Sequence, residues 1–366
     1  MSRTRSIPAL LIAISLAVAA CGGSGEGQAS GDEVYKLQFA SYNVPDAAEA
    51  LATKDWAERV SEATDGRVEI EFFFQEALLS AAETLPGVAD GRADMGYVAT
   101  GYYPAELPLT SVVGVPFISQ DPVAQGKALA DLYENNEALA EEWKSQGVHV
   151  LNWNPSSGNI VALKDAVTSL DDLKGIKVRG YGYVSEALKL AGMNPIGLAQ
   201  PEVYEALQRG VIEATSGASM NIAIDRKFQE VAPHFVGMNF GSYSITADVI
   251  SLTKWNSLPK DIRDAITSVS KEHPASYMEY LAEMEDESCG ALLQADGDVT
   301  LLPESDTQAW RAAAGPKIRD IWANDVKKAN PQADSNAFYD AYLASIQEYE
   351  TGSTYVEPMQ RCAARQ

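Results

Sequence analysis

Positive charge is scarce in this sequence. Its 366 residues include 28 Lys and Arg against 51 Asp and Glu, so the formal net charge at neutral pH is −23. Proteins that bind nucleic acid, or that lie on anionic lipid, need clustered basic side chains to contact phosphate groups. The basic residues here are scattered singly among acidic ones, so we expect no nucleic-acid partner and no adsorption to an anionic lipid surface.

Histidine and the common catalytic motifs are also scarce. The three histidines are isolated, and the sequence has no HxxxH, HExxH or CxxC spacing of the kind that binds zinc. A GxSxG nucleophile elbow is absent as well. The segment GYGYVS at 180–185 has two of the three glycines of a dinucleotide-binding loop, but Ser185 stands at the third position. We therefore expect no metal, no cofactor, no catalytic residue and no enzymatic activity.

Long apolar runs are confined to the N-terminus. Arg3 and Arg5 precede an apolar run over 7–19, and small residues lead to Cys21. This pattern is typical of a lipoprotein signal peptide over 1–20, in which Cys21 receives a lipid anchor; the alternative is a simple signal peptide with an incidental cysteine. The Gly- and Ser-rich segment 21–32 then predicts a flexible tether. We expect an exported protein, lipid-anchored on the outer face of the cytoplasmic membrane or in the periplasm, with no membrane-spanning helix.

Cysteine is limited to three residues. If Cys21 is acylated, Cys289 and Cys362 remain, and an oxidising compartment allows them to pair. We expect a disulfide that fixes the C-terminal tail; the alternative is two separate thiols.

Most of the chain alternates between strand-like and helix-like periods. Strands are predicted at 35–40, 68–74 and 93–98, with helices at 47–63 and 79–90 between them, and the same order returns at 176–215. Alternation of this kind predicts parallel-rich sheets flanked by helices. Three further strands are predicted at 112–118, 148–152 and 243–252, and long helices at 259–294, 306–329 and 336–350.

The repeated unit predicts an α/β fold with two lobes that enclose a cleft. We expect lobe I to comprise 33–156 and 245–284, and lobe II to comprise 157–244 and 285–366. Crossing strands and one long helix, kinked at Pro274, are expected to span the lobes. Ligands of open parallel sheets bind beyond the carboxyl ends of the strands, so the cleft is the expected binding site.

Arg179 is the main candidate for binding in that cleft. It ends a predicted strand of the second lobe, and a guanidinium can hold a carboxylate by two parallel hydrogen bonds. The alternative is a surface salt bridge with one of the many acids. Aromatic residues near predicted strand ends are candidates for the cleft wall; they are Tyr42, Tyr97, Tyr102, Tyr103, Trp153, Tyr181, Tyr183 and Tyr243.

Two segments carry a family resemblance. DLKGIKVR at 172–179 and EVYEALQRGVIE at 202–213 resemble paired motifs of the solute-binding proteins of tripartite ATP-independent periplasmic (TRAP) transporters, of the DctP-like family. The segments 56–70 and 90–96 are similar to the first lobe of that family. The resemblance covers roughly residues 35–302. It implies a two-lobed, periplasmic-binding-protein-like fold that closes on an organic acid and delivers it to the ion-driven membrane subunits of the transporter.

The resemblance also implies site residues. Arg179 matches the arginine that grips the substrate carboxylate. A second pocket arginine of the family falls near Asn159, and a family asparagine falls at Gly217, beside Ser216 and Ser219. Gln200 precedes the second motif, and the polar contacts of the first lobe align with Tyr42 and Thr100.

These departures from the family pattern predict the kind of ligand. With the second arginine absent, a highly charged ligand such as a dicarboxylate or a sialic acid is not expected. We expect a monocarboxylate with an apolar or aromatic body, held by Arg179 and surrounded by Tyr42, Trp153 and Tyr243. The alternatives are a secreted α/β enzyme that acts on a small carboxylate in the same cleft, and a structural or adhesive lipoprotein.

Overall fold

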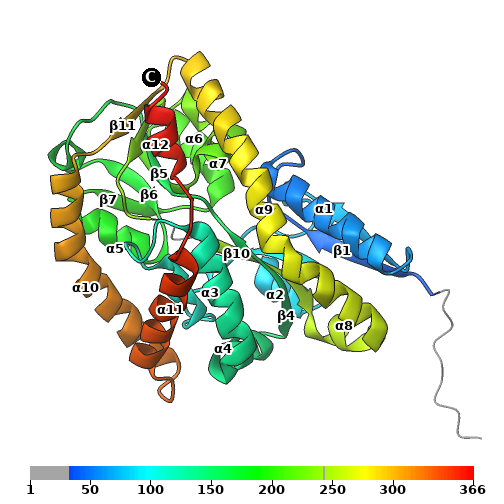
Figure 1. Cartoon of the computed structure of the whole chain (residues 1–366). Helices are drawn as coiled ribbons and strands as arrows, with labels where there is room; N and C mark the ends of the chain where they lie inside the picture. The colour runs from blue at the N-terminus through cyan, green and yellow to red at the C-terminus, as the bar shows by residue number, and fades with distance from the viewer. Residues whose placement is uncertain (1–32, 242–243) are drawn as a thin grey trace, which may run out of the picture. The chain divides into compact units, whose positions relative to one another are not determined.

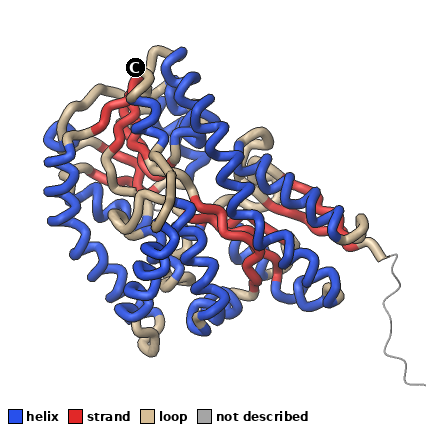
Figure 2. Tube along the Cα trace, in the orientation of Figure 1, coloured by secondary structure: helices blue, strands red, loops and turns tan. Residues whose placement is uncertain are grey.

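Two mixed β-sheets organise the chain (Figures 1 and 2). The computed structural model describes residues 33–241 and 244–366. The predicted signal peptide, the tether, Cys21 and Tyr243 lie outside the described residues. From Val34 to Gln366 the chain forms one compact unit. The predicted α/β class, with two sheets flanked by helices, is confirmed.

The first sheet has five strands in the order β2-β1-β3-β10-β4. β1 is parallel to β2 and β3, whereas β10 runs antiparallel between β3 and β4. Every residue of β10 is buried, as expected for a central strand covered on both faces. The strands are β1 Tyr35–Ala40, β2 Val68–Phe73, β3 Met95–Ala99, β4 Val148–Pro155 and β10 Ile245–Ser251.

The second sheet has six strands in the order β11-β9-β5-β8-β6-β7. β6 is parallel to β7 and β8, and β9 to β11, while β5 is antiparallel to β8 and β9. The chain passes between the sheets three times, from β4 to β5, from β9 to β10 and from β10 to β11. The strands are β5 Ile160–Leu163, β6 Lys177–Gly180, β7 Asn194–Gly197, β8 Ala214–Ala218, β9 His234–Gly237 and β11 Asp298–Leu301.

Helices surround both sheets (Figure 2). The α-helices are α1 Ala48–Ala63, α2 Thr84–Ala89, α3 Pro122–Asn135, α4 Glu137–Ser145, α5 Gly182–Leu190, α6 Val203–Gln208, α7 Met220–Asp225, α8 Leu252–Ser257, α9 Lys260–Gln294, α10 Glu304–Ala329, α11 Ser335–Glu350 and α12 Pro358–Ala363. Short 3₁₀ helices are η1 Thr100–Tyr102, η2 Thr110–Gly114, η3 Leu170–Leu173, η4 Gln200–Glu202 and η5 Phe228–Glu230. Among the described residues, no helix is both long and apolar enough to cross a membrane.

Helix α9 contacts elements of both sheets. It packs against α1 and β4 on one side and against α7 and α12 on the other, and Figure 1 shows it in yellow passing both sheets. The helix continues through Pro274, which lacks the N–H that would bond the carbonyl four residues earlier.

The predicted strand over 112–118 is wrong. The sequence forms the 3₁₀ helix η2 over Thr110–Gly114 instead, because Pro108 and Pro116 flank the segment and remove backbone donors that a sheet would need. The apolar residues Val112 and Val113 belong to this 3₁₀ helix and are buried.

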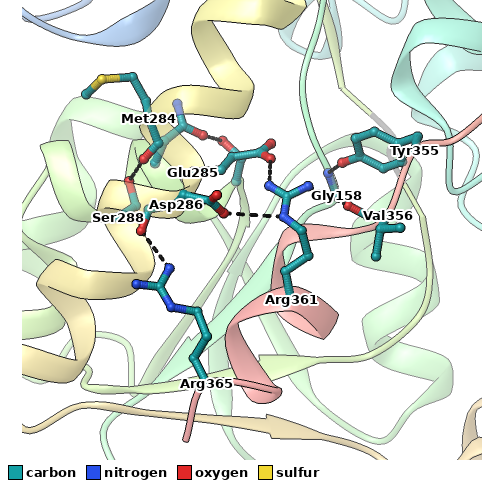
Figure 3. A network of polar contacts seen from close by, with 11 residues as sticks. Gly158, Met284, Glu285, Asp286, Ser288, Tyr355, Val356, Arg361 and Arg365 are labelled. Atoms are coloured by element: carbon teal, nitrogen blue, oxygen red, sulfur yellow. Dashed lines mark hydrogen bonds and ion pairs between the residues drawn. The ribbon is translucent and has the colours of Figure 1, made fainter.

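The C-terminal tail is fastened to α9 and to the connection between β4 and β5. A disulfide joins Cys289 of α9 to Cys362 of α12, the two residues that the sequence analysis pairs. Figure 3 shows the polar contacts beside it. Arg361 Nη2 lies 2.6 Å from Glu285 Oε2, and Gly158 N donates to Tyr355 Oη over 3.4 Å. The tail therefore joins α9 to a segment that links the two sheets.

Candidate functional site

A small cavity of about 30 Å³ lies where strand ends and loops of the two sheets meet. This volume is smaller than the roughly 300 to 1,000 Å³ of most small-molecule sites. Residues that follow β1, residues in and after β3, and residues at the end of β4 and the start of β10 line it from the five-stranded sheet. Residues of β6, β8 and the loops after them line it from the six-stranded sheet. The lining residues are Tyr42, Asn43, Glu49, Tyr97, Ala99, Gly101, Tyr102, Asn154, Ser156, Arg179, Tyr181, Gln200, Gly217, Ile222, Ser244, Thr246 and Tyr277.

Arg179 occupies the wall of this cavity at the end of β6. Only 1% of the residue is exposed. Its Nε donates to Leu198 O over 3.0 Å, and Nη1 donates to Ser216 O over 2.8 Å and to Gly217 O over 3.2 Å. Each of these acceptors is a neutral backbone carbonyl, so the contacts orient the guanidinium without neutralising its charge.

No described carboxylate forms an ion pair with Arg179. Several other arginines form ion pairs with acids. The guanidinium of Arg179 instead lies 4.5 Å from the centre of the Tyr181 ring. The surface salt bridge that the sequence left open is therefore not formed. A buried cation without a counterion is costly, so this position is suited to an anion.

Two glycines allow Tyr181 and Arg179 to take these positions. Gly217 has a φ of +77°, and a Cβ there would lie 2.3 Å from the Tyr181 ring and 2.7 Å from Arg179 Nη1. A Cβ on Gly101 would lie 2.5 Å from the other edge of the same ring. The ring is therefore held between a residue near β3 and a residue of β8, one from each sheet. The glycine at the position of the family asparagine is thus needed to accommodate the arginine and the tyrosine.

Polar contacts also connect the two sides of the cavity. Tyr102 Oη, next to β3, accepts hydrogen bonds from Arg179 Nη2 over 3.3 Å and from Gln200 N over 2.9 Å. Asn221 Nδ2 of α7 donates to Glu49 Oε1 of α1 over 2.9 Å. All three hydrogen bonds join a residue attached to the first sheet to a residue attached to the second, so the two sides are in contact around the cavity.

The cavity contains one buried acid and two amides that sequence reasoning missed. Glu49 is 4% exposed, and burial raises the pKa of its carboxyl. The Nδ2 atom of Asn43 is buried and has no hydrogen-bond partner in the described part of the chain, whereas the amide of Asn154 faces the buried Asp248 and lowers the pKa of that carboxyl. A signal for Glu49 was present, because it shares one helical face with the apolar residues Ala52 and Trp56.

Seven of the predicted residues line the cavity: Tyr42, Tyr97, Tyr102, Arg179, Tyr181, Gln200 and Gly217. Trp153 is not among the lining residues, for a simple reason. Successive residues of a strand point to opposite faces, so Asn154 of β4 lines the cavity while Trp153 packs against Tyr133 and Trp143.

Four other predicted residues also lie outside the lining. Thr100 donates to Ile245 O over 2.6 Å and borders a smaller adjacent cavity. Ser219 Oγ contacts Asn221 Oδ1, so it lies behind the cavity wall. The side chains of Asn159 and Ser216 are buried, with side-chain polar atoms that have no described partner, but neither residue lines the cavity. Ser216 contacts Arg179 through its carbonyl, where any residue type would serve.

The described residues include no group of three or more His, Cys, Asp and Glu side chains that could hold a metal ion. His149 and His273 are instead largely buried beside aromatic rings, and burial lowers the pKa of each imidazole, to about 4 and about 3. These histidines are therefore neutral at physiological pH.

Comparison with known proteins gives relatives across most of the chain. The 2,3-diketo-L-gulonate-binding periplasmic protein of Escherichia coli K12 is 25% identical over 293 residues, covering 79% of this chain and 88% of that protein. A monocarboxylate 2-oxoacid-binding periplasmic protein of a Nostoc species is 27% identical over 259 residues, covering 68% of each protein.

Solved structures are similar in fold. A TRAP periplasmic solute-binding protein from Desulfovibrio salexigens has a TM-score of 0.74 at 26% identity, with 88% of this chain and 98% of that chain covered. A Bordetella pertussis receptor that binds pyroglutamic acid has a TM-score of 0.74 at 23% identity, covering 84% and 99%. A Rhodoferax ferrireducens TRAP protein in complex with benzoate has a TM-score of 0.80 at 19% identity, covering 87% and 99%. The predicted two-lobed binding-protein fold is thereby confirmed.

Residues 39–325 match the DctP family, which is described as family 7 of the bacterial extracellular solute-binding proteins. This is a family of transport receptors and not of enzymes, so the alternative of a secreted enzyme is not supported. The chain belongs to family 7 of the bacterial extracellular solute-binding proteins, the solute-binding receptors of TRAP transporters.

Proposed function

We propose that this receptor captures an organic monocarboxylate in the cavity beside Arg179 and delivers it to the membrane subunits of a TRAP transporter. The observation that carries the proposal is the buried guanidinium of Arg179, which faces the cavity without an ion pair among the described residues. A bound carboxylate would supply the missing negative charge. Local positive charge is needed, because the net charge of −23 repels anions over most of the surface.

The contacts of Arg179 limit how it can hold the ligand. A guanidinium has five N–H groups. Nε and Nη1 face backbone carbonyls, and one N–H of Nη2 faces Tyr102. One N–H of Nη2 is left for the ligand, so the carboxylate is held by one hydrogen bond from Arg179 together with other donors of the cavity. The unpartnered amide of Asn43 is suited to this role.

The remaining wall favours a ligand with a flat or apolar body and a single acid group. Among the described lining residues, Arg179 is the only lysine or arginine, which disfavours a dicarboxylate. Tyrosine side chains provide much of the remaining surface, and aromatic rings pack well against planar ligands. Benzoate and pyroglutamate, which the solved relatives bind, have this character.

Closure of two lobes around the ligand would complete the site. We propose lobes over 33–156 with 245–284 and over 157–244 with 285–366. A ligand that contacts both sides stabilises the closed state through contacts that are absent when the receptor is open.

We also propose that Cys21 carries the lipid anchor. The variant Cys21→Ser is expected to be released from membranes and to incorporate no labelled palmitate.

Isothermal titration calorimetry with benzoate and pyroglutamate tests the binding site. Arg179→Ala is expected to lose more than tenfold in affinity, since removing one partner of a desolvated charge pair costs roughly 2 to 5 kcal/mol. Arg209→Ala, at an exposed arginine paired with Glu205, is the matched control and is expected to bind as the wild type does. Unchanged affinity in a correctly folded Arg179→Ala protein would refute the assignment.

A further inference from the structure

An acidic side chain lies in the cavity that we assign to an acid. Glu49 lines the same cavity as Arg179 but belongs to α1, on the other side. Two carboxylates close together repel each other, so Glu49 works against binding of a simple monocarboxylate. Its presence in the binding cavity requires an explanation.

The surroundings of Glu49 satisfy it only in part. Asn221 Nδ2 donates to Oε1 over 2.9 Å, and the backbone N–H of Glu49 itself also bonds the carboxyl. Arg226 is close enough to lower the pKa of Glu49, but its Nη2 donates to Tyr42 O over 2.8 Å, and the two side chains form no ion pair. Asp225 is also close, and burial together with Glu49 raises its pKa to about 7. A carboxylate can accept about four hydrogen bonds, so Glu49 keeps acceptor capacity for a partner from the cavity.

Helix stability does not explain the acid. An acid in the first turn of a helix contributes roughly 0.3 to 1 kcal/mol through the helix dipole, and an exposed acid would contribute the same. Burying a carboxyl costs more than this. The neighbours of Glu49 on the buried face, Ala52 and Trp56, are apolar and would pack equally well around an apolar residue.

The polar groups of the cavity therefore fall into two sets. Arg179 and Asn43 present hydrogen-bond donors, which suit carboxylate oxygens. Glu49 presents an acceptor, and it forms no ion pair with Arg179, so the two groups are free to contact different parts of one ligand.

We propose that Glu49 recognises a second group of the ligand, and that the ligand is a carboxylic acid that also carries an N–H donor, as an amide or an ammonium group. The inference rests on the proposed function and narrows its substrate class. Glu49 is then the residue that selects between acids of similar size, because an acid without the donor leaves the buried carboxyl without a partner.

Matched pairs of ligands test the inference. Pyroglutamate is compared with its lactone analogue, 5-oxotetrahydrofuran-2-carboxylate, in which a ring oxygen replaces the N–H. 4-(Aminomethyl)benzoate is compared with 4-methylbenzoate. Calorimetry on the wild type is expected to show at least about tenfold preference for the donor-bearing member of one pair, since a hydrogen bond to a charged group contributes roughly 1.5 to 3 kcal/mol.

Variants assign the preference to Glu49. Glu49→Gln is expected to reduce the ratio of affinities to less than about threefold. The acid that lacks the N–H donor is expected to bind to this variant at least as tightly as to the wild type. Glu58→Gln, on the exposed side of the same helix, is the control and is expected to keep the ratio. Glu49→Asp, which withdraws the carboxyl from the cavity by one methylene group, is also expected to reduce the ratio and serves if Glu49→Gln does not fold.

The outcomes separate the two proposals. Equal binding of both members of each pair by the wild type, with affinity lost in Arg179→Ala, overturns the role of Glu49 and leaves the proposed function intact. A preference that survives in folded Glu49→Gln also overturns it. Failure of the wild type to bind any of the four acids would count against the proposed function itself, and the inference would fall with it.

Discussion

At the scale of single residues, the site depends as much on a position without a side chain, Gly217, as on side chains such as Arg179. Arg179 could be predicted from its place at a strand end and from the family motif around it. Trp153 and Asn154 could not be told apart, because the sequence does not reveal which face of β4 turns toward the cavity. Glu49 was missed because a lone acid at the start of a helix is usually a solvated residue.

Gly217 provides a prediction at this scale. Gly217→Ala adds a methyl group that meets both Tyr181 and Arg179, and it also strains a backbone with a φ of +77°. We expect a loss of roughly 1 to 3 kcal/mol in the free energy of unfolding and more than tenfold in affinity for benzoate or pyroglutamate. Urea denaturation and calorimetry measure the two effects.

The matched control is Gly210→Ala. Gly210 has a similar φ of +72°, but a Cβ there would have no heavy atom within 4 Å. This variant is expected to lose stability through backbone strain alone and to keep its affinity. Equal loss of affinity in both variants would show that backbone strain, and not contact with Arg179 and Tyr181, causes the effect.

At the scale of elements, long segments were predictable and short ones were not. The helices predicted at 259–294, 306–329 and 336–350 agree closely with α9, α10 and α11, because many turns of regular periodicity are hard to misread. The segment 112–118 was misread because a short apolar run is compatible with a strand or with a buried turn. The two helices over Pro122–Ser145 were not predicted, although Asp121 caps α3 and Asn136 caps α4.

The C-terminal tail adds a pH dependence at this scale. Glu357, which precedes α12, is 8% exposed, and burial together with the nearby Glu285 raises its pKa from 4.5 to about 7. Arg361 opposes this shift, and the side chain of Glu357 packs on Gly158. The folded state therefore binds this proton more tightly than the unfolded state does. The contribution of Glu357 to stability is fully present below about pH 4.5 and is lost as the pH rises through about 7.

Glu357→Gln tests this pH dependence. We expect the stability of the variant relative to the wild type to increase between about pH 5 and pH 8 by the order of 1 to 3 kcal/mol, measured by denaturation at each pH. Glu287→Gln, at an exposed acid of α9, is the control and is expected to show a constant difference. A constant difference for Glu357→Gln as well would mean that Glu357 is ionised in the folded protein throughout this range.

At the scale of the whole molecule, binding depends on contacts between the two sheets. The family resemblance predicted the existence of two lobes, but the contacts themselves involve Tyr102, Gln200, Glu49 and Asn221, whose pairing depends on how separate parts of the chain meet. A sequence without an aligned partner residue does not contain that information.

Tyr102→Phe tests the importance of these contacts. It removes the oxygen that accepts hydrogen bonds from Arg179 and Gln200, so we expect affinity to fall by roughly threefold to thirtyfold, in line with about 1 to 2 kcal/mol for the lost contacts. Small-angle scattering with saturating ligand is expected to show a larger radius of gyration than for the wild type. Tyr103→Phe is the control, because Tyr103 Oη bonds Ala81 O and Leu85 N on its own side. Equal affinity of Tyr102→Phe and the wild type would argue against a role in closure.

The strand order of the first sheet also constrains how the protein is made. β4 has β10 as its sole neighbour in that sheet, yet β5 to β9, all strands of the other sheet, lie between β4 and β10 in the chain. A chain that leaves the cell with its N-terminus first can complete neither the β4 edge nor the cavity until Ser251 has emerged. Until then β4 has an unpaired edge that invites wrong pairing. The same delay keeps the chain from folding too early, so that it stays extended long enough to cross the membrane.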